Sequence, residues 1–181
     1  MLQTERLGLR PVNRSDIDAI LALASDRLIA DTMISIPHPI TPHDVEGWAG
    51  FGDAATTHTT NCYFATRRNS DKSLVGVISL RDIDHEHRLA ELSFWIGRQF
   101  WGHAYATEGA RAVIGYAFTR MGLNRLQAFR MVRNEASGKV LLKLGFREEG
   151  RLRQRVVKWG VFEDVVAYGI LKADVADSGA A

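Results

Sequence analysis

The chain has 181 residues, of which 46% are hydrophobic and 24% charged, and these proportions are ordinary for a soluble globular protein. A formal net charge of +2 is too small to favour nucleic acid or an anionic membrane surface as a partner. The length suits one hydrophobic core, so we expect a single domain over residues 1–172 and a disordered tail over residues 173–181.

Composition also bears on where and how the chain works. The single cysteine, Cys62, excludes an internal disulfide, and its strand-like surroundings favour a buried thiol over a nucleophile. The first ten residues include charged side chains and no apolar segment typical of a signal peptide, and no apolar run reaches membrane-spanning length, so we expect a cytoplasmic protein. We expect this protein to be a monomer or a homodimer. Five basic residues cluster near the C-terminus: Arg147, Arg151, Arg153, Arg155 and Lys158. Because their neighbours are strand-like, we expect a solvated strand face here rather than a nucleic-acid site.

The N-terminal part predicts one strand and two short helices. Residues 5–11 alternate apolar and polar side chains, which is typical of a strand. Asp16 is expected to open a helix over residues 17–24, and a second helical piece is expected after Asp44. Three prolines exclude regular helix from the loop 31–43, which we expect to form a wall of the substrate site.

The middle of the chain predicts an antiparallel meander followed by a long helix. Strand-like runs over 62–68, 74–83 and 88–96 are separated by turn-forming residues. Apolar residues then recur with helical spacing over 106–121, and Gly122 supplies a left-handed stop.

The C-terminal part predicts a strand over 125–132, a helix over 135–144 closed by Gly145, and two strands joined near Trp159 within 151–171. The whole order predicts an α+β fold in which helices pack on the faces of one mixed, mostly antiparallel sheet.

Small residues stand directly before the long helix, in the stretch Gly97–Val113. The first turn of a helix leaves backbone N–H groups without partners and carries the positive end of the helix dipole. A preceding turn with little side-chain bulk lets an anion approach those donors, so this stretch predicts a phosphate-binding turn. The sequence contains no G-x-G-x-x-G, which argues against a dinucleotide site.

Two motifs carry a family resemblance. "QFWGHA" matches a Gln/Arg-x-x-Gly-x-Gly/Ala signature at Gln99, Gly102 and Ala104, and "NEASGKVLLKLGF" matches an Asn-x-x-Ser-x-x-Val-x-x-Lys-x-Gly-Phe pattern. On these motifs, and over about residues 4–171, the chain resembles the GCN5-related N-acetyltransferase (GNAT) superfamily and its RimJ/RimL-like branch. The resemblance implies a single GNAT-like domain with a splayed pair of strands that holds acetyl-CoA.

The implied reaction is direct transfer of acetyl from acetyl-CoA to a primary amine in a ternary complex. A protein N-terminus is the favoured acceptor, and a polyamine, an amino acid or an aminoglycoside stays open. A non-catalytic acyl-CoA-binding regulatory module is the rival from another class.

The resemblance also implies the residues that bind the donor. The pyrophosphate is expected on the backbone amides of the signature turn: Gly102, His103, Ala104, Tyr105 and Ala106. The pantetheine arm is expected along the backbone near Ile96 and Arg98, beside the signature residue Gln99. Asn134 is expected to contact the cofactor, with a helix N-cap as the alternative. Trp101 is expected to pack against the long helix.

Proton transfer needs a base, because an ammonium cannot attack a thioester. Glu91 is the expected base, acting directly or through water, and a salt bridge with a neighbouring strand is the alternative; Glu108 is a weaker candidate. Leu141 stands where many relatives carry a tyrosine acid, so Ser137 is expected to donate a proton to the leaving thiolate, unless it only caps the helix. The triplet His85–His87 lies in a turn without an evident third ligand, and we expect no metal site.

Overall fold

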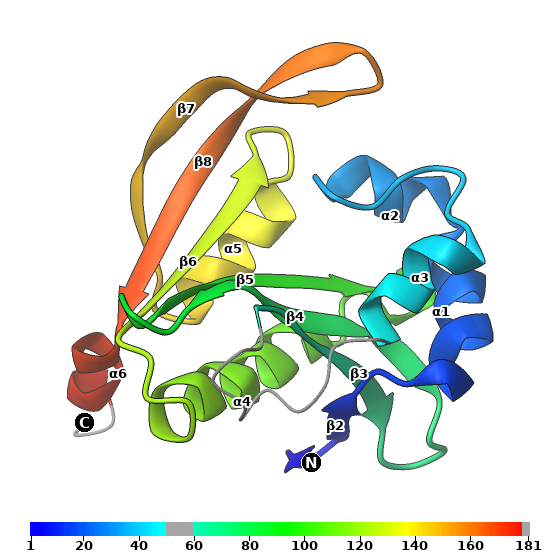
Figure 1. Cartoon of the computed structure of the whole chain (residues 1–181), viewed down its shortest axis with the longest axis horizontal. Helices are drawn as coiled ribbons and strands as arrows, with labels where there is room; N and C mark the ends of the chain where they lie inside the picture. Colours follow the sequence, from blue (N-terminus) through cyan, green and yellow to red (C-terminus); the bar gives the residue numbers. More distant parts are fainter. Residues whose placement is uncertain (50–59, 179–181) are drawn as a thin grey trace.

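The computed structural model describes residues 1–49 and 60–178, and within them eight strands form one sheet in the order β1-β2-β3-β4-β5-β6-β8-β7 (Figure 1). The strands are β1 (Leu2–Gln3), β2 (Leu7–Pro11), β3 (Cys62–Arg68), β4 (Leu74–Asp84), β5 (Leu89–Ile96), β6 (Arg125–Met131), β7 (Arg147–Lys158) and β8 (Val161–Leu171). The helices are α1 (Ile17–Ala24), α2 (Arg27–Thr32), α3 (Pro42–Ala49), α4 (Tyr105–Thr119), α5 (Glu135–Lys143) and α6 (Lys172–Ser178).

The sheet is antiparallel except where β5 meets β6. These two strands run parallel and pair only through Leu89 with Arg125, Ala90 with Leu126, and Glu91 with Gln127. Beyond Glu91 they diverge, and Figure 1 shows β6 and β8 turning away from β5. The expected α+β fold with a splayed strand pair is therefore confirmed, and we call the opening between β5 and β6 the fork.

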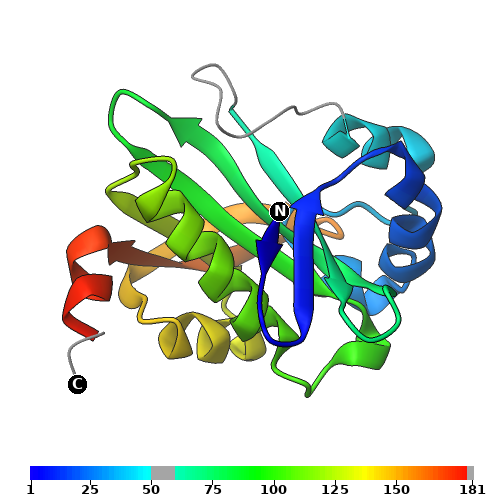
Figure 2. The same cartoon turned by 90° about the horizontal axis from the view of Figure 1, so that it is seen from below.

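Each face of the sheet has its own apolar core. On one face α4 and α5 cover the large core that contains Leu80, Leu92 and Leu126 (Figure 2). On the other face α1, α2 and α3 cover a smaller core that contains Val77 and Trp95. Because successive strand residues point to opposite faces, β4 and β5 contribute side chains to both cores.

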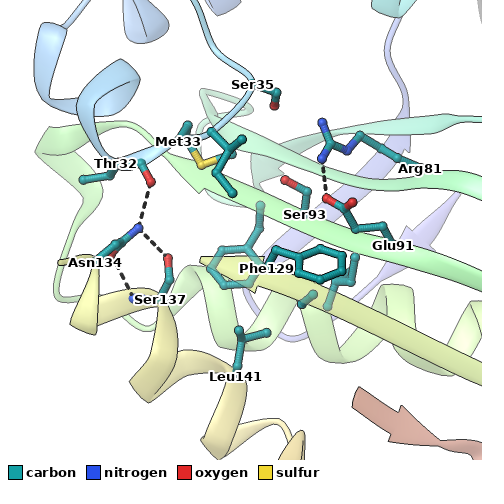
Figure 3. Close-up of a pocket in the computed structure, with 14 residues that line it drawn as sticks. Thr32, Met33, Ser35, Arg81, Glu91, Ser93, Phe129, Asn134, Ser137 and Leu141 are labelled. Atoms are coloured by element: carbon teal, nitrogen blue, oxygen red, sulfur yellow. Dashed lines mark hydrogen bonds and ion pairs between the residues drawn. The ribbon is translucent and has the colours of Figure 1, made fainter. Parts of the chain in front are cut away.

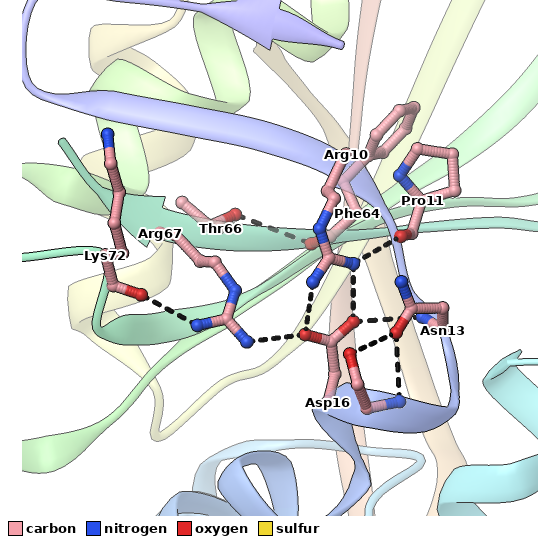
Figure 4. A network of polar contacts seen from close by, with 9 residues as sticks. Arg10, Pro11, Asn13, Asp16, Phe64, Thr66, Arg67 and Lys72 are labelled. Carbon is pink, nitrogen blue, oxygen red and sulfur yellow. Dashed lines mark hydrogen bonds and ion pairs between the residues drawn. The ribbon is translucent and has the colours of Figure 1, made fainter.

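Asp16 stands at the N-cap position of α1, as predicted, but its side chain makes no capping hydrogen bond to this helix. Its side chain is fully buried and accepts hydrogen bonds from Arg10 at 2.7 and 2.8 Å, from Arg67 at 2.6 Å and from the Asn13 N–H at 2.9 Å (Figure 4). Burial raises the pKa of a carboxyl, but these donors outweigh it and hold the pKa of Asp16 below its usual range. The carboxylate thus joins β2 and β3 to the start of α1.

Two helix starts on the α1 to α3 side differ from the prediction. Helix α2 was not predicted, and it begins after Asp26, whose carboxylate accepts the Leu28 N–H at 2.9 Å. Helix α3 begins at Pro42 rather than after Asp44. Proline fits the first helical position because its missing N–H has no partner there, and the Asp44 carboxylate accepts the Thr41 N–H at 2.8 Å.

The expected disordered tail over 173–181 is wrong for the part that the structure describes. Residues 172–178 form α6, which is anchored at its start: the Leu171 N–H donates to Asp174 at 2.8 Å, and Asp174 pairs with Arg147 at 2.8 Å. Residues 179–181 lie outside the described residues. No helix among residues 1–49 and 60–178 is long and apolar enough to cross a membrane.

Candidate functional site

The free edge of β5 forms one side of the fork. The Gly97 N–H donates to the Val75 carbonyl of the β4 side at 2.8 Å. Because backbone groups alternate in direction along an antiparallel strand, Phe94 and Ile96 turn their N–H and C=O groups away from β4. These groups face the space that β6 has left, so an extended ligand could bind them as an added strand does.

The turn before α4 is built from left-handed residues. Gly102 has φ of +81° and Ala104 has φ of 60°, and Ala104, the N-cap residue, makes no side-chain hydrogen bond to α4. A Cβ added to Gly102 would meet nothing within 4 Å. Within the part of the chain that the structure describes, the first N–H groups of α4 have no side-chain acceptor and stand beside open space, which fits the diphosphate of a CoA-type ligand.

The aromatic side chains of this turn make polar contacts with the backbone. Trp101 is 45% exposed, and its indole N–H donates to the Ile96 carbonyl at 2.6 Å, while its packing against α4 stays a prediction. A carbonyl oxygen has two lone pairs, so Ile96 can still accept a second hydrogen bond. The His103 ring stacks on Tyr105 with ring centroids 5.5 Å apart, and its Nδ1 lies 3.0 Å from the Trp101 carbonyl.

The other residues predicted to bind the donor lie in the same segment. Arg98 and Gln99 are exposed in a short 3-10 turn after β5, and Arg98 approaches Asp26 at 3.9 Å. Ala106 lies in the first turn of α4. The structure thus brings the predicted donor residues into one continuous path from the fork to α4, with Asn134 across the fork.

Asn134 caps α5, which was the alternative to a cofactor contact. Its Oδ1 accepts the Ser137 N–H at 3.2 Å, and its Nδ2 donates to the Thr32 carbonyl at 2.9 Å and to Ser137 Oγ at 3.0 Å (Figure 3). Ser137 Oγ accepts in this last bond, so its own proton stays available for donation. Leu141, buried at the predicted tyrosine position, lines the same cavity as Ser137.

Glu91 forms the salt bridge that was the alternative to its role as a base. It pairs with Arg81, its direct partner across β4 and β5, and the two side chains are 13% and 21% exposed. Both residues line a cavity of about 30 Å³ at the fork, together with Asn134, Ser137 and Leu141. Figure 3 shows Glu91 and Ser137 on opposite sides of Phe129. The predicted base and the predicted acid therefore share one cavity.

Glu108, the weaker candidate base, is engaged elsewhere. Its carboxylate accepts hydrogen bonds from the Thr4 hydroxyl at 2.5 Å, from the Arg6 N–H at 2.9 Å and from Arg6 Nε at 2.7 Å. Burial raises the pKa of this carboxyl, but the donors outweigh it and hold the pKa of Glu108 below its usual value. Glu108 therefore fastens the N-terminal segment to α4.

A second cavity of about 210 Å³ adjoins the fork on the α1 to α3 face. It shares Met33, Ser35, Arg81 and Ser93 with the fork cavity. Its remaining lining residues are Ile36, Trp48, Tyr63, Val77, Ser79 and Trp95. Met33, Ser35 and Ile36, from the loop 31–43, line this cavity, and the expected role of the loop as a wall of the substrate site stays a prediction. The strand residues were missed, although alternation along β4 and β5 places Ser79 and Ser93 on the same face.

The β7–β8 hairpin holds this wall in place. Lys158 was expected on a solvated strand face, but it is only 6% exposed. Its ammonium donates to the Ile36 carbonyl at 2.8 Å, which gives the buried group a partner. Burial lowers the pKa of Lys158. The Trp159 indole donates to Asp31 at 2.9 Å, and Arg133 pairs with the same carboxylate at 2.8 Å. The hairpin thus supports the loop 31–43, and none of its residues lines either cavity.

Comparisons with known proteins bear on the family. The profile of the Acetyltransferase (GNAT) domain family matches residues 6–147. The chain is 32% identical to "Uncharacterized N-acetyltransferase YoaA" of Bacillus subtilis (strain 168), over 95% of this chain and 97% of the relative. It is 25% identical to spermidine N(1)-acetyltransferase of Escherichia coli (strain K12), over 92% of this chain and 86% of that protein.

A similar fold occurs in the crystal structure of spermidine N-acetyltransferase from Vibrio cholerae in complex with CoA and spermine. The TM-score is 0.83 at 24% identity, over 96% of this chain and 99% of that one. The profile match, the fork and the uncapped turn before α4 agree, and the chain belongs to the GNAT family as an N-acetyltransferase that uses acetyl-CoA.

Proposed function

We propose that this chain transfers acetyl from acetyl-CoA directly to a small primary amine at the fork. The observation that carries the proposal is the pair of adjoining cavities. The fork cavity has Glu91 and Ser137 in its lining, at the open end of the β5–β6 pairing. The second cavity has a volume of about 210 Å³ and adjoins the first through the lining residues that the two share. That volume is below the ~300–1,000 Å³ of pockets that take drug-sized ligands, so it suits a small acceptor.

The donor is held by backbone groups. The N–H groups of residues 102–106 would bind the diphosphate, and the outward-facing groups of Phe94 and Ile96 would bind the pantetheine amides. An N–H of the same strand edge would stabilise the charge that develops on the thioester oxygen. Asn134 would orient Ser137 from the far side of the fork.

Glu91 and Ser137 move the protons. Glu91 takes a proton from the acceptor ammonium, directly or through water, and the freed amine attacks the thioester carbon. The new bond joins nitrogen to the acetyl carbon, and the carbon–sulfur bond breaks. The attacking nitrogen must lose its second proton to become an amide. Ser137 donates its hydroxyl proton towards the leaving thiolate, and this second proton, passed through solvent, restores the hydroxyl.

The acceptor class separates the competing hypotheses. A protein N-terminus, as in Rim-type enzymes, needs room for a continuing chain, whereas the relatives named spermidine N(1)-acetyltransferase act on a polyamine. A module without catalysis would bind acetyl-CoA and transfer nothing.

Isothermal titration with acetyl-CoA, followed by thiol-release assays over small amines, spermidine and a short peptide, tests the proposal. We expect binding together with turnover of a small amine. Binding without turnover of any amine would favour the regulatory module, and turnover of the peptide alone would favour the Rim-type acceptor.

A further inference from the structure

Six of the ten residues that line the larger cavity are aromatic or aliphatic, and the other four are polar. The rings of Trp48 on α3 and Tyr63 on β3 are nearly parallel, with an interplanar angle of 9° and centroids 5.6 Å apart. Trp95 and Val77 form the floor and are 6% and 2% exposed. Burial raises the pKa of the Tyr63 hydroxyl, so this wall carries no charge at neutral pH. Such walls favour the flat or branched apolar body of a ligand.

The charge of the lining is balanced. Among the described residues that line the two cavities, Arg81 and Glu91 are the charged ones, and they pair with each other. A polyamine brings further ammonium groups besides the one that reacts. Burying such a group without a partner is costly, and no described lining residue offers it a second carboxylate.

Hydroxyl groups mark the junction of the cavities. Ser79 and Ser93 are direct partners across β4 and β5, and Ser93 lines both cavities. Neutral hydroxyls accept and donate hydrogen bonds, so they can hold an amine nitrogen between the aromatic side chains of the larger cavity and Glu91. An acceptor in this position would place its amine at the fork and its apolar body against Trp48.

We propose that the acceptor is a primary monoamine with one ring-sized apolar group, bound against Trp48, Tyr63 and Trp95, and that the chain discriminates against polyamines. This inference rests on the proposed function and specifies its acceptor. It separates the chain from the spermidine acetyltransferases to which it is similar.

The test compares kcat/KM for phenethylamine, spermidine and a short peptide with a free N-terminus, using the full chain and saturating acetyl-CoA. We expect phenethylamine to exceed spermidine by about tenfold or more, because spermidine would bury an unpaired ammonium. A kcat/KM for spermidine or the peptide that equals or exceeds that of phenethylamine would overturn the inference and leave the proposed function standing. Bound acetyl-CoA without product from any of the amines would overturn both.

Two variants locate the selectivity in this cavity. Trp48→Ala should lower kcat/KM for phenethylamine about tenfold, mainly through KM, with acetyl-CoA affinity unchanged. Phe162→Ala is the matched control, since Phe162 is 64% exposed on β8 and lines neither cavity. Equal losses for phenethylamine and spermidine in Trp48→Ala would count against the inference.

Ser35→Glu supplies a gain of function if Trp48→Ala fails to fold. Ser35 is exposed and lines both cavities, so a carboxylate there can form an ion pair with a second ammonium. We expect kcat/KM for spermidine to rise about twofold to fivefold, the range of one exposed ion pair, while that for phenethylamine does not rise. A rise for both amines, or for neither, would contradict the proposed acceptor position.

Discussion

Replacing Glu91 by glutamine removes the one carboxylate among the described residues that line the fork cavity, while the side chain keeps nearly the same shape. If Glu91 accepts the proton of the ammonium, kcat should fall by ~10²–10⁴. Acetyl-CoA affinity should change little, because the donor's diphosphate is expected at the turn before α4. The ion pair with Arg81 complicates the outcome, since its loss alone will lower stability.

The size of that loss follows from burial. The paired side chains are 13% and 21% exposed, between a surface pair worth about 0–1 kcal/mol and a buried pair whose breakage costs about 3–5 kcal/mol. We therefore expect Glu91→Gln to lower the free energy of unfolding by about 1–3 kcal/mol. Rates must be measured on protein shown to be folded by circular dichroism.

Arg81→Gln is the matched control, because it breaks the same ion pair and keeps the carboxylate. The assay is amine-dependent thiol release at saturating acetyl-CoA, near pH 7 and at higher pH. We expect Arg81→Gln to lose less than about tenfold in kcat, well below the loss in Glu91→Gln. A full rate in Glu91→Gln at pH 7, or equal losses in both variants, would refute the base assignment. A modest loss recovered at higher pH would show that solvent removes most of the protons.

Three further changes test other parts of the site and fold. Gly102→Val should weaken acetyl-CoA binding in titration calorimetry, because a branched side chain at φ of +81° strains the turn and enters the open space beside it. Gly122→Val, at φ of +69° and equally open beyond the other end of α4, is the control and should lose stability but keep the affinity. Ser137→Ala should lower kcat about 10²-fold or less, because a thiol of pKa ~8.5 leaves readily without help; unchanged single-turnover thiol release would remove Ser137 from the mechanism. Asp16→Asn should lower the free energy of unfolding at pH 7 by about 3–5 kcal/mol, since Arg10 and Arg67 lose their buried counter-charge. Because the folded-state pKa of Asp16 lies below 3.8, the wild type should keep this advantage above about pH 4 and lose it as the pH falls further. Urea midpoints that differ equally at pH 7 and at acid pH would contradict this explanation.

The sequence predicted the elements that have a clear periodicity. The stripe over 106–121 and the strand runs of β3, β4, β5 and β6 appear within a few residues of their expected bounds. Helix α2 was missed because six residues are too short to show a helical stripe. Helix α6 was missed because its small, polar residues resemble a tail, whereas contacts of Asp174 fix its start.

The sequence predicted the positions of site residues only where they belong to a recognisable motif. The turn at 102–106, Asn134 and Ser137 follow from motifs, while their roles remain predictions. The helix start at Asp16 was predictable, but its ion pairs were not, because pairing of β2 with β3 brings Arg10 and Arg67 together. Tertiary contacts also placed Trp48 beside Tyr63 and buried Lys158 against Ile36, and neither contact leaves a local signal.

Direct transfer at the fork is tested by rapid mixing of the chain, preloaded with less than one equivalent of acetyl-CoA, with phenethylamine or with buffer. Free thiol and acetylated amine are quantified together over a single turnover. We expect one thiol for each acetylated amine, at the same rate, and no thiol before the amine is added. Thiol released ahead of the amine would show an acyl-enzyme, and bound acetyl-CoA that yields no acetylated product with phenethylamine, spermidine or a peptide would contradict acetyl transfer by this chain.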